Sequence, residues 1–196
     1  MLRAFLLSLT VALGFAPLQK PLPDAPAEPY RVPEAYEIYS SLFMARSSAS
    51  ADIPKKMIIR QETIPPSDMC LKPEGESILV LAPVIGDFVE KNNRPWLLQQ
   101  MFTMPRSYEF ISARDLDLMF KNDAPGWKTF YERYPGSAGF VQVSAVGFNA
   151  EKTIAVVYVA HGCGGLCGAG GFSVLEKKDG KWQEMIWKGS SCAWVS

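Results

Sequence analysis

The sequence predicts an α+β fold in which N-terminal helices pack on one face of a mostly antiparallel sheet that ends in a four-strand C-terminal meander. Apolar residues at helical spacing are concentrated in the first two-thirds of the chain, which predicts helices there. The last third consists of short apolar runs separated by hairpin-length turns, and such connections require antiparallel neighbours. After removal of an export signal, the remaining length fits one domain, which we place at residues 34–196.

Residues 1–27 predict a signal peptide and the start of a proline-rich linker. Arg3 precedes a run of 13 apolar residues, Ala4–Ala16. This run is too short to span a bilayer, which takes about 20 residues. Cleavage is expected after Ala16 or Ala27. Residues 28–33 are expected to form an extended linker, because proline fixes φ and lacks a backbone donor. The mature protein is therefore expected to be exported, periplasmic or extracellular, with no stable membrane anchor.

The domain is expected to open with a helix and a strand. The helix begins at Pro33, a residue type that suits a first helical turn, and Ala35, Ile38 and Leu42 follow at helical spacing. The strand is Lys56–Ile64, which is rich in Ile and Thr.

The middle of the chain is predicted to alternate short strands with helices. The predicted strands are Ser77–Ala82, which Pro83 should end, and Ser107–Ile111. The predicted helices are Asp87–Asn92, Pro95–Phe102, Ser112–Phe120, which a capping box opens, and a segment from Pro125 to Tyr134.

Four successive strands are predicted in the last third: Phe140–Phe148, Thr153–Ala160, Gly171–Lys177 and Lys181–Trp187. The Asp-Gly pair before the last strand is a strong hairpin signal. Thr153–Ala160 is apolar on both faces, which predicts a central strand that is covered on both sides.

The segment His161–Gly171 holds the single histidine, two of the four cysteines and six of the fifteen glycines. Its glycines are expected to permit positive φ angles in a long hairpin turn: Gly162, Gly164, Gly165, Gly168, Gly170 and Gly171. An export signal and an even number of cysteines predict disulfides. Four cysteines allow three pairings, and we favour Cys163–Cys167 with Cys70–Cys192.

Two chemical alternatives remain for this segment. His161, Cys163, Cys167 and Cys192 could form a Cys₃His zinc site, although their spacing matches no common finger pattern. His161 and Cys163 share a face if the segment is a strand, so the imidazole could lower the pKa of the thiol and make it a catalytic nucleophile. The sequence contains no phosphate-binding glycine motif, and we expect no cofactor.

Charge gives little guidance to a partner. Acidic and basic residues number 20 each and are scattered. Nucleic-acid binding requires a clustered basic footprint and is therefore disfavoured. The partner is left unknown.

Three segments carry a resemblance. They are Gly126–Gly139, with the pattern GWxxFYxxYPGSxG, Val146–Asn149, with VGFN, and Gly171–Trp182, with GFxxLEKKDGKW. The chain resembles a set of exported bacterial proteins of unknown function over less than half its length. The resemblance implies export and a sheet-rich C-terminal half, and it implies no activity. The ending of the third segment is also similar to the final hairpin of the nuclear-transport-factor-2 superfold.

We therefore expect a non-enzymatic exported binding or interaction module that disulfides stabilise. The alternative is a thiol-dependent enzyme, or a redox or metal-binding protein, that uses His161, Cys163 and Cys167. Three C-terminal aromatic residues are better candidates for an exposed aromatic surface than those at helical spacing, although we expect even these to pack against the helices: Trp182, Trp187 and Trp194.

Overall fold

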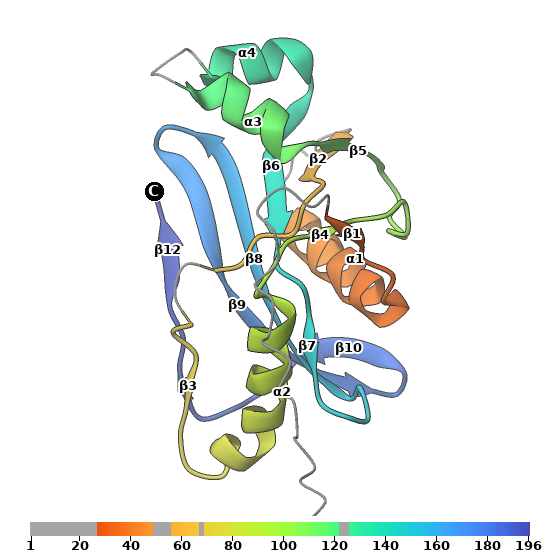
Figure 1. Cartoon of the computed structure of the whole chain (residues 1–196), viewed down its shortest axis with the longest axis vertical. Helices are drawn as coiled ribbons and strands as arrows, with labels where there is room; N and C mark the ends of the chain where they lie inside the picture. The colour runs from red at the N-terminus through yellow and green to blue at the C-terminus, as the bar shows by residue number, and fades with distance from the viewer. Residues whose placement is uncertain (1–26, 49–55, 67–68, 122–125) are drawn as a thin grey trace, which may run out of the picture.

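The structure, a computed structural model, describes residues 27–48, 56–66, 69–121 and 126–196. It is an α+β fold with four helices and one large mixed sheet (Figure 1). The helices are α1 (Pro33–Ser48), α2 (Ser77–Lys91), α3 (Ala113–Phe120) and α4 (Gly126–Arg133). The predicted signal segment lies outside the described residues, apart from Ala27.

The large sheet has the strand order β10-β9-β8-β6-β2-β5, with β7 and β12 attached beside it. These strands are β2 (Lys56–Arg60), β5 (Ser107–Ile111), β6 (Ser137–Val143), β7 (Gly147–Phe148), β8 (Ile154–Gly164), β9 (Cys167–Lys178), β10 (Lys181–Glu184) and β12 (Ala193–Val195). β2 pairs in parallel with β5 and β6, and every other pairing in this sheet is antiparallel. The strands β6, β8, β9 and β10 form a C-terminal meander.

Two small two-stranded sheets fasten loops to the domain. β1 (Glu28–Pro29) pairs with β4 (Trp96–Leu97), and β3 (Lys72–Pro73) pairs with β11 (Gly189–Ser190). The segment expected as a linker thus begins with a paired strand, and Tyr30 next to it is buried.

Helices cover both faces of the sheet, so the expectation of helices on one face is wrong. On β8, Ala155, Val157 and Val159 pack with the cluster around α1. Val156 points the other way and packs with α2. The cause is β8 itself: a strand that is apolar on both faces must be covered on both. Further along the second face, α3 and α4 pack over Phe140 and its neighbours.

α2 replaces two predicted elements, the strand Ser77–Ala82 and the separate helix Asp87–Asn92. Its buried residues Leu81, Val84 and Phe88 recur at helical spacing and pack on the sheet. Pro83 lies inside this helix with its side chain exposed, so it does not end the element. Apolar residues on every side of the helix hid this spacing.

Two further predictions, for Pro95–Phe102 and for Phe140–Phe148, are wrong. Pro95–Phe102 is not a helix; its residues Trp96–Leu97 form β4, whose partner β1 lies far away in sequence. The strand predicted at Phe140–Phe148 is split into β6 and β7. The split falls at Ala145, whose N–H and C=O both bond to the buried Asn92 side chain, at 2.9 and 3.1 Å, instead of to a strand.

Buried tyrosines in and before α1 bond to the segment between β6 and β7. The Tyr39 hydroxyl donates to the Ser144 carbonyl (2.7 Å), and the Tyr30 hydroxyl accepts from the Val146 N–H (3.0 Å). Burial raises the pKa of Tyr36 to about 12, and its hydroxyl bonds to the backbone of Tyr30 and Gln99. These hydroxyls satisfy backbone groups and are structural.

Candidate functional site

The predicted loop at 161–171 is mostly strand. β8 and β9 remain paired up to Gly164 and Cys167, so only Gly165 and Leu166 form the turn. None of the six glycines in this segment has a positive φ, and the expected long turn is therefore wrong. The tip of the hairpin lies against α4, where the Tyr131 hydroxyl donates to the Cys163 carbonyl at 2.7 Å.

Close packing explains several of these glycines. A Cβ at Gly162 would lie 3.3 Å from the Trp127 ring of α4, and one at Gly168 would lie 3.0 Å from the Trp194 ring. Both are tighter than ordinary van der Waals contact. Glycine is used here because a neighbouring aromatic ring occupies the space of a side chain.

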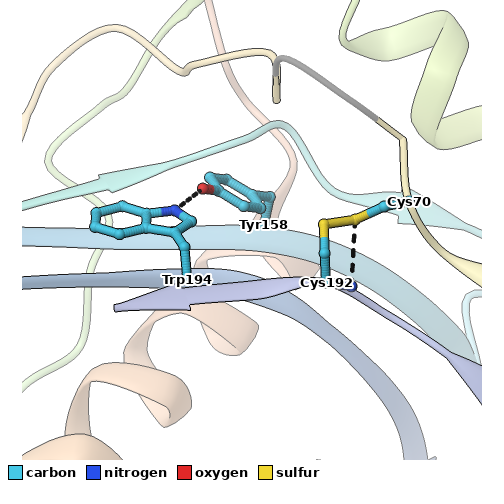
Figure 2. The surroundings of a disulfide bond; sticks show 4 residues. All are labelled: Cys70, Tyr158, Cys192 and Trp194. Carbon is cyan, nitrogen blue, oxygen red and sulfur yellow. Dashed lines mark hydrogen bonds between the residues drawn. A yellow bond between two sulfur atoms is a disulfide. The ribbon is translucent and has the colours of Figure 1, made fainter. Parts of the chain in front are cut away.

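Two disulfides fix the hairpin tip and the residue that precedes β12. Cys163 and Cys167 join across the hairpin tip, with their Cα atoms 5.0 Å apart. Cys70 joins Cys192 across 122 residues of sequence, with Cα atoms 5.7 Å apart (Figure 2). These are the two pairs that the sequence favours, and they leave no free cysteine.

The geometry gives no support to a thiol nucleophile or a metal site. The His161 Nε2 atom lies 2.6 Å from the Ala138 carbonyl oxygen, so the ring is bonded to the neighbouring strand. Cys163 is oxidised, and Cys192 is bonded to Cys70 rather than grouped with His161. Within the described residues, no group of three His, Cys, Asp or Glu side chains is placed to hold a metal ion.

The C-terminal strand β12 lies along β9 and is held at three points. Cys192, just before it, is tied by the disulfide. The Trp194 Nε1–H donates to the Tyr158 hydroxyl at 2.7 Å (Figure 2), and the Ser196 N–H donates to the Gly168 carbonyl at 3.0 Å. Chain ends usually fray unless they are tied down. The last residues of this chain are tied in an extended, exposed conformation.

The outer edge of β12 is open. Because Ser196 bonds to β9, the alternation of an antiparallel ladder turns the backbone groups of Trp194 toward β9 and those of Ala193 and Val195 away from it. Within the described residues, no strand pairs with the other side of β12. The N–H and C=O groups of Ala193 and Val195 therefore point outward.

This edge also lacks the charges that protect the other edges of the sheet. Residues 189–196 contain no charged side chain and no proline. By contrast, the edge strand β10 carries Lys181 and Glu184, and the edge strand β5 carries Glu109 in an ion pair with Lys56. Charges and proline are the usual means by which proteins block pairing at an exposed strand.

Apolar side chains surround the open edge. Leu166 at the hairpin tip is 92% exposed, Val195 is 85% exposed and Trp194 is 44% exposed. Of the three tryptophans considered as candidates for an exposed surface, Trp194 is exposed, whereas Trp182 and Trp187 are half-buried and pack against the core. Sequence reasoning missed Leu166 and Val195, although the uncharged C-terminal run was a visible signal.

A concave region lies at the C-terminal end of α2, beside β1 and β4. It is a groove of about 500 Å³ lined by Tyr30, Arg94, Trp96 and neighbouring residues. Two of its cations are paired within the fold, since Arg94 pairs with Glu28 at 2.9 Å and Lys91 with Asp87 at 2.6 Å. Arg31 and Glu90 also line the groove, and both are exposed.

In the part of the chain that the structure describes, we find no helix with the length and apolar character needed to cross a bilayer. Comparisons with protein-family models, with curated proteins and with solved structures give no match to this chain.

Proposed function

We propose that the protein is an exported, non-enzymatic interaction module that binds an extended segment of another polypeptide along β12. The observation that carries the proposal is the open, uncharged edge of this strand, with the outward N–H and C=O groups of Ala193 and Val195. An extended peptide can add to such an edge as a further strand, with main-chain hydrogen bonds supplying affinity. Trp194, Val195 and Leu166 supply apolar contact beside it.

The two disulfides support this assignment because they hold the edge in its binding conformation. The Cys70–Cys192 bond fixes the residue next to β12, and the Cys163–Cys167 bond closes the hairpin tip beside it. A strand that is already ordered loses less conformational entropy on binding. Disulfides also form and persist in the compartments to which an export signal directs a chain.

The test uses peptides selected by phage display against the oxidised full chain. Val195→Pro removes the outward N–H and leaves the bonds between β12 and β9 in place, since that N–H makes none of them. We expect selected peptides to bind Val195→Pro at least about tenfold more weakly than the wild type. Isothermal titration calorimetry measures the difference.

Glu184→Pro is the matched control, because Glu184 occupies an outward-facing position on the edge strand β10. It should leave peptide affinity unchanged. Failure to enrich any peptide, or equal affinity for the wild type and Val195→Pro, would refute the proposal. A free-thiol titration addresses the thiol alternative, since reactive thiols in the exported protein would count in its favour.

A further inference from the structure

The outer face of α2 is apolar. Ser77–Gly86 contains no charged residue, and only Leu81, Val84 and Phe88 of this helix are buried against the sheet. On the opposite side, Leu79 is 81% exposed. Further exposed residues of this side are Ile78, Val80, Ala82, Pro83, Gly86 and Val89. Helices with apolar residues on every side are normally buried, and exposed apolar patches mark contact sites.

Gly86 is unexplained by the fold of a single chain. A Cβ built at this position meets no atom within 4 Å, and the residue has no positive φ. Glycine in the interior of a helix is unfavourable relative to alanine. Gly147 provides a contrast, because a Cβ there would collide with Phe88 of α2. Gly86 therefore leaves an open depression on the apolar face.

We propose that this face binds the same face of a second copy of the chain, with the two α2 helices antiparallel. Leu79 and Gly86 are seven residues apart, about two helical turns, so they lie on one line along the exposed side. A two-fold axis between Ala82 and Pro83 places Leu79 of each copy over Gly86 of the other. The contact is thus self-complementary, as a two-fold interface must be.

Charge favours a second copy as the occupant. The same axis places Glu90 of one copy over Gly75 of the other, and Lys188 lies beside Gly75, with its Cδ 4.0 Å from a Cβ built there. Neither Glu90 nor Lys188 has an ion-pair partner within the described residues. Two Glu90–Lys188 pairs would therefore form across the interface.

A lipid surface fits this face less well. Helices that lie on membranes carry Lys and Arg on their polar side, where they meet anionic headgroups. The charged residues of α2 itself are Asp87, Glu90 and Lys91, so the helix has no excess of basic residues. Dimerisation through α2 does not depend on peptide binding at β12, which is a separate element of the fold (Figure 1).

The test measures self-association of the oxidised full chain by sedimentation equilibrium. We expect a dimer with a dissociation constant of about 100 μM or lower. Gly86→Leu and Leu79→Ala should each weaken dimerisation at least about tenfold, the first by opposing two leucines and the second by leaving the depression empty. The combined Leu79→Ala/Gly86→Leu chain again sets a large side chain against a small one, with the leucine now at position 86 and the small residue at position 79. It should therefore dimerise more tightly than either single variant.

Gly86→Leu fills open space in the single chain, so its melting temperature at low concentration should not fall. A wild-type chain that stays monomeric at about 1 mM refutes the proposal, and so does a double variant with no recovery over the singles. Vesicles of zwitterionic and anionic lipid test the other occupant. Binding of the monomer to them through Leu79 would assign the face to a membrane and overturn the dimer.

Discussion

At the residue scale, Gly170 shows how strongly the C-terminal strand depends on a missing side chain. A Cβ at this position would lie 2.7 Å from the Tyr158 hydroxyl and would collide with the Trp194 Nε1 atom, the two groups that bond to each other. Gly170→Ala should therefore displace Trp194 and lower the free energy of unfolding by about 1–3 kcal/mol. Urea unfolding measures the loss, and tryptophan fluorescence reports the displaced ring.

Gly165→Ala is the control, since Gly165 has open space around it and no positive φ. Its free energy of unfolding should stay within about 0.5 kcal/mol of the wild type. If both substitutions cost the same, the packing of Trp194 over β9 is not as described.

The same residues show what the sequence could and could not predict about the site. The predicted export signal and the even number of cysteines indicated disulfides, and the pairing that we favoured among the three possible ones is the pairing in the structure. The role of the glycines was misjudged, because a glycine that accommodates a distant ring looks like one that permits a positive φ. Trp194 is 24 residues from Gly170, and only the pairing of β12 with β9 brings them together.

At the element scale, elements that depend on local interactions were predicted from the sequence, and an element that depends on a partner far away in the chain was not. The helix α3 was predicted from a local contact, the Ser112 hydroxyl that accepts from the Asp115 N–H at 3.0 Å. The hairpin between β9 and β10 was predicted from Asp179-Gly180, and both residues have positive φ. By contrast, β4 has its partner in β1, 68 residues earlier, and no local pattern marks it.

α2 was missed because a local rule is overridden by packing. A proline is usually assumed to end an element, yet here the chain continues as a helix through Pro83, whose side chain is exposed. Leu81, Val84 and Phe88 gain enough by packing on β8 and β9 to hold the helix together.

Pro83→Ala tests this assignment of α2. Inside a helix, proline lacks the N–H that bonds to the carbonyl four residues earlier and its ring crowds that carbonyl. Replacing it by alanine should therefore raise the free energy of unfolding by about 1–2 kcal/mol, as measured by urea denaturation. If Ser77–Ala82 were instead a strand that Pro83 ends, the substitution would give no gain. Ala82→Gly should do the opposite and cost about 1 kcal/mol in a helix.

At the scale of the whole molecule, the two disulfides act over very different lengths of chain. Cys163–Cys167 spans 4 residues and lies within one hairpin, whose strands are already paired. Cys70–Cys192 spans 122 residues and joins the loop before α2 to the strand at the end of the chain. Between these two cysteines lies most of the described sheet, so this bond constrains the unfolded chain as a whole.

Replacing each pair by serine should separate the two contributions. In the loop-entropy model, closing the short loop stabilises the fold by about 2 kcal/mol and closing the long one by about 5 kcal/mol. The Cys70→Ser/Cys192→Ser chain should therefore lose more free energy of unfolding than the Cys163→Ser/Cys167→Ser chain, in guanidinium titrations of oxidised protein. It should also lose amide protection in β12, because Cys192 is the fixed point from which that strand begins. Equal losses, or a β12 that stays protected without the long-range bond, would show that the C-terminal strand holds its position on β9 by pairing alone.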